Sequence, residues 1–92
     1  MIVYAELEFI IPAAHSLKDK RAVLQRMITR TKQKFNISIA ESDHQNVWQR
    51  TKLSIVTVAS SKDAADREMT RAIYYLDSNP EWERLSTLRE YL

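Results

Sequence analysis

Two polar segments of this sequence, residues 15–21 and 41–50, carry the side chains best suited to chemistry, including both histidines. We name their seven candidate residues the polar rim: His15, Ser16, Glu41, Asp43, His44, Trp48 and Arg50. Histidine beside a carboxylate can transfer protons or bind a metal ion, whereas tryptophan and arginine are typical of contacts with nucleic acid or a partner protein. No motif specifies a substrate, so the pattern predicts a place for binding rather than a defined reaction.

The histidines could serve a metal ion or a hydrolytic reaction, but their spacing does not favour either. Asp43 and His44 could act with Glu41, and with His15 across a gap, yet the sequence has no His-x-x-x-His or equivalent pattern. Adjacent strand residues also point to opposite faces. The alternative is that Asp43 and His44 hydrogen-bond backbone groups and hold a hairpin turn. We therefore predict a binding protein with no metal, no cofactor and no catalytic residue.

Trp48 and Arg50 have two interpretations. They could stack on a base or grip a partner chain, since aromatic and arginine side chains dominate both kinds of contact. Trp48 could instead cover one end of the hydrophobic core, and this is the interpretation we favour.

Positive charge is concentrated in residues 16–34, where seven basic residues and one acidic residue give a local charge of +6. Residues 61–92 carry five basic and seven acidic side chains. A basic element on a near-neutral body indicates an anionic partner such as nucleic acid. Five residues are expected to contact phosphate groups: Lys18, Lys20, Arg21, Arg26 and Arg30. The first-turn amides near Leu17 could also bind a phosphate, although Asp19 competes for that position. The alternative is that these basic side chains only form the solvent-exposed face of a helix and bind no partner.

Composition bounds the class of protein. A chain of 92 residues predicts one domain, residues 1–92, with one core. No apolar run approaches the roughly 20 residues that cross a bilayer, and the first residues do not resemble a secretion signal. The absence of cysteine excludes disulfides and thiolate chemistry. We expect a soluble, cytoplasmic protein with no membrane partner.

Periodicity predicts the first half of the fold. Residues 2–11 alternate and predict a strand, with Val3, Ala5, Leu7, Phe9 and Ile11 on one side. Ser16 is a typical N-cap, and a helix is expected over 16–34. The inward stripe of this helix is Leu17, Leu24, Met27, Ile28, Thr31 and Phe35. Alternating runs at 35–40 and 52–59 predict two strands joined by a hairpin. Because the chain has no glycine, any left-handed position of that turn is expected to be Asn or Asp.

The second half predicts a helix and a closing strand. Ser60 or Ser61 caps a helix that ends near residues 79–80. The last segment has a helical spacing of Trp82, Leu85, Leu88 and Leu92, but we predict a strand near 84–92 because the preceding elements leave the first strand with a free side.

The resulting order, β-α-β-β-α-β, is that of the α+β ferredoxin-like split βαβ fold. It predicts an antiparallel sheet in the order 4-1-3-2 with both helices on one face. The loops after the first and second strands then lie at the same end, so the two polar segments meet. The uncovered face would place Tyr4, Glu6 and Glu8 beside Arg50, Lys52 and Ser54, a surface suited to ion pairs and poorly suited to base stacking.

Three motifs make the sequence resemble a known family. They are His-Ser-Leu-Lys-Asp-Lys-Arg at 15–21, Phe-Asn-Ile-Ser-Ile-Ala-Glu-Ser-Asp-His-Gln at 35–45, and Trp-Gln-Arg at 48–50. In these the chain is similar to the YlxP-like family of small bacterial proteins, a domain of unknown function. The resemblance implies a ferredoxin-like fold with a closing strand. It also implies an association with ribosomes or RNA, since genes of this family commonly lie beside those of translation initiation and ribosome-binding factor A.

The leading hypothesis is therefore a non-enzymatic protein that contacts RNA or a ribosomal particle through its basic helix. A protein-interaction module acting as a homodimer, joined through the uncovered sheet face or the edge of the second strand, is the alternative. A small metal-dependent hydrolase built on Asp43 and His44 comes third.

Overall fold

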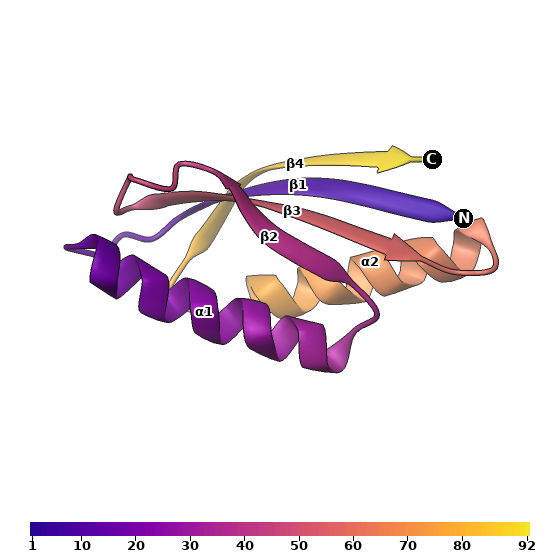
Figure 1. Ribbon diagram of the computed structural model, residues 1–92, viewed down its shortest axis with the longest axis horizontal. Helices are drawn as coiled ribbons and strands as arrows, with labels where there is room; N and C mark the ends of the chain where they lie inside the picture. The colour runs from indigo at the N-terminus through magenta and orange to yellow at the C-terminus, as the bar shows by residue number, and fades with distance from the viewer.

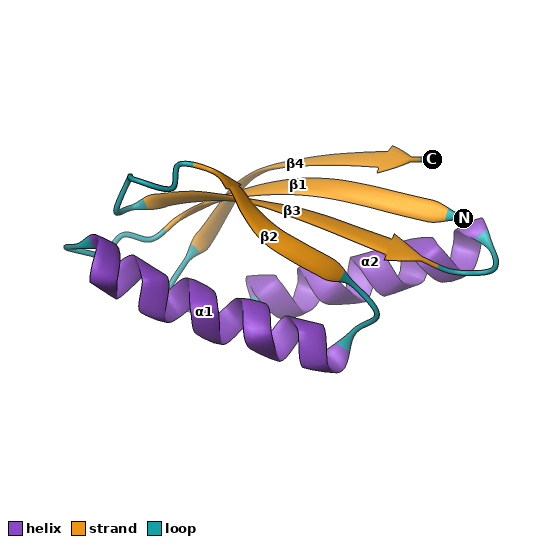
Figure 2. Ribbon diagram, viewed as in Figure 1, coloured by secondary structure: helices purple, strands orange, loops and turns teal.

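Four strands and two helices make up the computed structural model, which describes all 92 residues (Figures 1 and 2). Their bounds are β1 (Ile2–Ile10), α1 (Leu17–Lys34), β2 (Ser38–Asp43), β3 (Arg50–Val58), α2 (Lys62–Asp77) and β4 (Glu83–Tyr91). The strands form one sheet in the order β2-β3-β1-β4, and each neighbouring pair is antiparallel. Both helices lie on one face of it, below the sheet in Figure 1. The predicted order 4-1-3-2 is the same order counted from the other edge, so the fold prediction is confirmed.

Serine caps begin both helices, as predicted. The backbone N–H of Asp19 donates to Ser16 Oγ at 3.1 Å, and that of Ala64 donates to Ser61 Oγ at 3.1 Å. The Asp19 carboxylate turns back and accepts from the backbone N–H of His15 at 3.0 Å. Because Asp19 already places a negative charge at the start of α1, this helix end is a poor phosphate site.

The strand predicted over 35–40 begins later, at Ser38, because residues 35–37 form the turn that leaves α1. The backbone N–H of Phe35 still donates to the Thr31 carbonyl at 3.0 Å, and that of Ile37 donates to the Phe35 carbonyl at 3.0 Å. The apparent alternation of Phe35 and Ile37 therefore belongs to a helix end and not to a strand.

The last segment is a strand, as predicted, and β4 pairs with β1. The pairing shifts between Glu8, which faces Ser86, and Phe9, which faces Arg84. Leu85 is therefore an extra residue opposite this step, a β-bulge that interrupts the alternation of the strand. The alternation of this segment is therefore weak in the sequence, and Leu85 and Leu88 are about half exposed.

The core lies between the sheet and the helices. Alternate residues of β1 are fully buried there, as predicted: Val3, Ala5, Leu7 and Phe9. From α1 the core receives Val23, which the predicted stripe omitted, together with Leu24 and Met27. Three members of the predicted stripe are only partly buried: Leu17, Ile28 and Phe35. Neither helix combines the length and the apolar character needed to cross a membrane.

One tryptophan closes the core, and it is not the predicted one. The Trp82 ring stacks on Phe9 with centroids 4.2 Å apart, and its Nε1–H donates to the Leu76 carbonyl at 2.7 Å. Trp48 is 52% exposed in the β2–β3 hairpin, so the interpretation that it covers the core is wrong.

The hairpin contains the single residue of the chain with a positive φ angle. That residue is His44, with φ of 63°, so the expectation of Asn or Asp at the left-handed position is wrong. Histidine is among the non-glycine residues that adopt this conformation more often than most. Its ring nitrogen Nε2 lies 2.8 Å from Glu8 Oε1.

Candidate functional site

The two polar segments meet at one end of the molecule, as predicted. The backbone N–H of Ile11 donates to the Gln49 carbonyl at 2.8 Å. The side-chain amide of Gln49 donates back to the carbonyls of Pro12 at 3.2 Å and Ala14 at 3.1 Å. Figure 1 shows the hairpin and the start of α1 at the same end of the fold.

Lys20 joins these segments from inside the protein. Its side chain is 1% exposed, and its Nζ lies 2.9 Å from Glu41 Oε2. The same ammonium donates to the carbonyl of Val47 at 2.8 Å and to that of His44. The Thr51 hydroxyl donates to Glu41 Oε2 at 2.7 Å. With three acceptors for its three protons, Lys20 has no donor left, and its expected contact with phosphate is wrong.

The sequence contained a signal for this burial. Lys20 lies four residues before Leu24 and seven before Met27, which places it on the apolar face of α1. A lysine in an apolar stripe can bury its hydrocarbon stem and bring its ammonium to acceptors of a neighbouring element. The prediction that Lys20 contacts phosphate considered only its charge and not its place on the apolar face of α1.

Five cations of α1 have no ion pair with a carboxylate: Lys18, Arg21, Arg30, Lys32 and Lys34. All five are exposed. Arg26 differs, because it pairs with Glu81 in the loop before β4. The exposed surface of α1 therefore carries free positive charge along its whole length, with Asp19 as the only acidic residue of the helix. Lys32 and Lys34 were not among the predicted contacts, although the count of basic residues included them.

The cations of the sheet are neutralised instead. Lys52 Nζ lies 2.9 Å from Glu6 Oε1, and Arg50 pairs with Glu8 Oε1 at 2.6 Å. The predicted ion pairs on the uncovered face are thereby confirmed. A hydrogen bond from Lys52, and a second from Tyr4, hold the pKa of Glu6 below its ordinary value. The hydrogen bond to Glu6, and then the negative charge of Glu6, raise the pKa of Lys52.

Glu8 connects the sheet with the hairpin. Partial desolvation alone would raise the pKa of this carboxyl, but the hydrogen bond to His44 and the positive charge of Arg50 together lower it. The Asp43 carboxylate accepts from the backbone N–H of His44 at 2.7 Å. Asp43 and His44 are thus engaged in holding the hairpin, the structural role that we had set beside a chemical one.

The polar rim therefore separates into two groups. Ser16, Glu41, Asp43, His44 and Arg50 contact other protein groups. Trp48 and His15 expose their side chains. No group of three or more histidine and acidic side chains lies close enough together to hold a metal ion.

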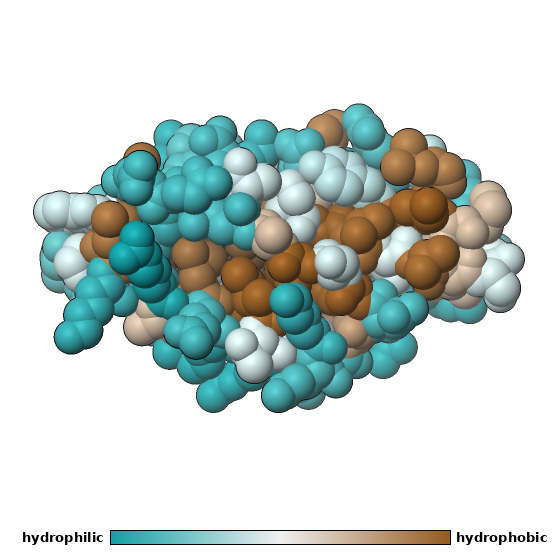
Figure 3. Space-filling view, in the orientation of Figure 1, coloured by the Kyte–Doolittle hydropathy of each residue, from teal (hydrophilic) through white to brown (hydrophobic).

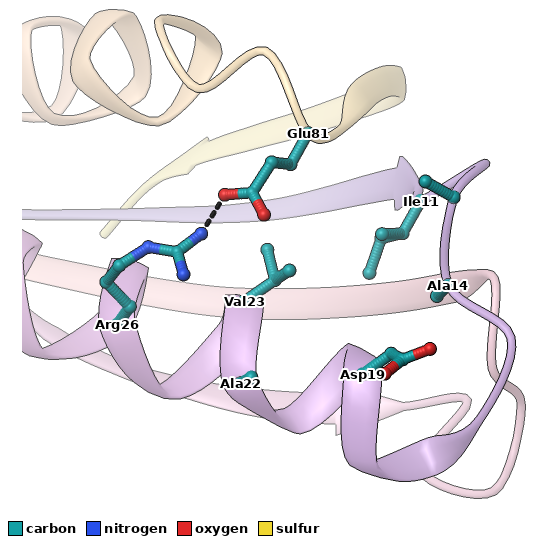
Figure 4. A pocket seen from close by; sticks show the side chains of 8 residues that line it. Ile11, Ala14, Asp19, Ala22, Val23, Arg26 and Glu81 are labelled. Carbon is teal, nitrogen blue, oxygen red and sulfur yellow. Dashed lines mark ion pairs between the residues drawn. The ribbon is translucent and has the colours of Figure 1, made fainter.

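A cavity of 350 Å³ opens beside the rim, between the loop after β1 and the first turns of α1 (Figure 4). Its walls are small apolar side chains, including Ala14, Ala22 and Val23. The pair of Arg26 and Glu81 spans its far side in Figure 4. Because Arg26 lines this cavity and is bound to Glu81, it is less available for phosphate than the five free cations.

Comparison with known proteins adds the family. A family model described as "Protein of unknown function (DUF503)" matches residues 2–89. The chain belongs to the DUF503 family. This DUF503 chain is 48% identical over 91 residues to "Uncharacterized protein YlxP" of Bacillus subtilis (strain 168), and the match covers 99% of each chain. The resemblance to YlxP-like proteins is thereby confirmed.

Solved structures similar to this DUF503 protein confirm the fold class. A "De novo designed protein Foldit4" has a TM-score of 0.61 at 10% identity, covering 100% of this chain and 99% of that one. The designed protein LFR1 1 "with ferredoxin fold" has a TM-score of 0.58 at 12% identity, covering 100% of this chain and 87% of that one. At these identities the likeness establishes the ferredoxin fold alone.

Proposed function

We propose that this protein is a non-enzymatic RNA-binding protein that associates with ribosomal particles through the outer side of α1. The observation that supports the proposal is the distribution of free charge. Five exposed cations without a carboxylate partner lie on this helix: Lys18, Arg21, Arg30, Lys32 and Lys34. The ribosomal part rests on the resemblance to the YlxP-like family.

The shape and charge of α1 suit a phosphate backbone. A helix of 18 residues is about 27 Å long, enough to follow several consecutive phosphates. Figure 3 shows hydrophilic side chains along the outer side of α1, at the bottom of the view, and hydrophobic surface at the centre and right. On the sheet, Glu6 and Glu8 cancel the neighbouring cations. RNA is thus attracted to the helical side of the molecule.

Salt-dependent binding of RNA by paired variants tests this proposal. Lys18→Gln with Arg21→Gln removes two free cations, whereas Arg50→Gln with Lys52→Gln removes two cations that are already paired on the sheet. For a single-stranded RNA, the first variant should lower the slope of log affinity against log salt by about 1.4, since each lost phosphate contact contributes about 0.7. The second variant, with the same change in formal charge, should keep the wild-type slope. Equal slopes in all three proteins would refute the role of α1.

A second candidate function, a homodimeric interaction module, is favoured by one feature of the uncovered sheet face. Ile2 lies between Val58 of β3 and Leu92, and these three apolar side chains are 39%, 57% and 70% exposed. A second copy could bury this row against its own. Light scattering would give twice the monomer mass for the wild type, and Val58→Lys should return it to the monomer mass. A monomer at all concentrations would exclude this function.

A further inference from the structure

A shallow groove of 390 Å³ lies on the outer surface of α2, beside the end of α1. Its lining contains three aromatic residues and no carboxylate: Phe35, Thr70, Arg71, Tyr74, Tyr75 and Ser78. The rings of Phe35 and Tyr75 pack at 5.9 Å with planes inclined by 58°. Tyr74 is 79% exposed, the largest exposed fraction among the large apolar side chains of this protein. An exposed aromatic ring that lies beside cations can stack on a nucleobase.

Two cations lie beside the aromatic rings of this groove. The Arg71 guanidinium lies 5.7 Å from the centre of the Phe35 ring, and Lys34 Nζ lies 5.1 Å from that of Tyr75. Glu68 is the acidic residue in contact with this group, at 3.6 Å from Arg71, and it also accepts a hydrogen bond from the backbone N–H of Asn36. Lys34 has no carboxylate partner, and it connects the free cations of α1 with the Tyr75 ring of the groove.

We propose that this groove binds an unpaired nucleobase of single-stranded RNA, stacked on Tyr74, while the adjoining phosphates lie on Lys34 and Arg71. The inference rests on the proposed RNA-binding function and specifies the form of RNA. Aromatic rings with neighbouring cations and no lining carboxylate match a base and its phosphate, since the ring stacks on any base and the cations neutralise the backbone. A volume of 390 Å³ lies at the small end of ligand sites, which suits one nucleoside.

One hydroxyl group of the groove supports the same ligand. The Thr70 oxygen accepts a hydrogen bond from Arg89 at 3.0 Å, which leaves its own proton free to donate. A free hydroxyl donor at the wall of the groove can bind a base carbonyl or a ribose oxygen. Double-stranded RNA, whose bases are stacked and paired, could not place a base on Tyr74.

The test is the affinity of full-length variants for a 5′-labelled single-stranded RNA of about ten nucleotides, measured by fluorescence anisotropy at one salt concentration. Tyr74→Ala should weaken binding by about 5- to 150-fold, the loss that corresponds to one base stacked on an aromatic ring. Tyr74→Phe, which keeps the ring, should bind like the wild type. Tyr91→Ala is the matched control, because Tyr91 is also an exposed tyrosine but lies on β4. Thermal melting should show that Tyr74→Ala folds normally, since its side chain contributes little to the core.

A strand of abasic ribose phosphate separates the base from the backbone. It should bind the wild type and Tyr74→Ala equally, because it has no base to stack. If the wild type binds no RNA, the proposed function fails and this site with it. If the wild type binds RNA and Lys18→Gln with Arg21→Gln lowers the salt slope, but Tyr74→Ala binds the labelled RNA as tightly as the wild type, the base site alone is refuted. The groove would then face a different partner, such as a protein.

Discussion

Removal of the buried lysine provides the sharpest test of how the polar end of this protein is held together. In Lys20→Met, the hydrocarbon stem is replaced by a side chain of similar volume, but Glu41 and the carbonyls of His44 and Val47 lose their donor. Loss of one partner of a buried ion pair costs about 3–5 kcal/mol. Because Glu41 is 19% exposed and keeps its hydrogen bond from Thr51, we expect the low end, about 3 kcal/mol.

Urea unfolding followed by circular dichroism measures this loss directly. In thermal unfolding of a domain of this size, a loss of about 3 kcal/mol corresponds to a fall in Tm of about 12–24 °C. Lys18→Met, at an exposed position two residues away, is the matched control and should change stability by less than about 0.5 kcal/mol. Lys20→Met with Glu41→Gln should recover about 1 kcal/mol or more of the loss, because the amide carries no uncompensated charge and still accepts from Thr51.

The result that would refute this reasoning is a Lys20→Met protein within about 0.5 kcal/mol of the wild type. Lys20 would then not be held in a desolvated pair. The variant also separates structure from binding. In its folded state it should keep the wild-type salt slope for RNA, because Lys20 contributes no phosphate contact.

Three further outcomes are expected. Neutralising Arg30 alone should lower the RNA salt slope by about 0.7, measured by anisotropy across a salt series; an unchanged slope would place the RNA away from that part of α1. Glu8→Gln should have a lower urea midpoint than the wild type at pH 7, and this difference should shrink below about pH 4.5. The pKa of Glu8 is lowered in the folded protein, so its carboxylate stabilises the fold above its ordinary pKa of 4.5. That stabilisation is lost as the pH falls through the pKa of the folded state. A loss of stability that stayed constant down to pH 3 would contradict this. In urea unfolding, Trp82→Ala should lower the free energy of unfolding by about 3–5 kcal/mol, because its ring is buried against Phe9. Trp48→Ala should lower it only slightly, because that ring is exposed. An equal loss in the two variants would contradict the placement of the two rings.

The fold could be predicted because its signals are local. Alternation in residues 2–11 and the serine caps at 16 and 61 fix the element types, and the element order then leaves few arrangements. What could not be predicted depends on partners distant in the sequence. Which tryptophan covers the core is decided by Phe9, which lies 73 residues before Trp82 in the chain.

The candidate site was predicted in position and partly in content. The meeting of the two polar segments followed from strand direction. Which cations are paired and which are free could not be predicted, because this depends on the carboxylate that lies beside each one. Lys20 pairs with Glu41 and Arg26 pairs with Glu81, and neither pairing has a local signal in the sequence. The aromatic groove was missed because Tyr74 lies on the outer side of α2 and Phe35 had been assigned to the core and to a strand.

A fold that needs a positive φ angle at one position only, His44, can be built without glycine. Glycine is the residue that widens the range of backbone conformations of a denatured chain most. Its complete absence leaves a stiffer denatured ensemble, so that less backbone entropy is lost when this small sheet assembles. Part of the resistance of the protein to unfolding thus originates in the disordered chain and in no contact of the native state.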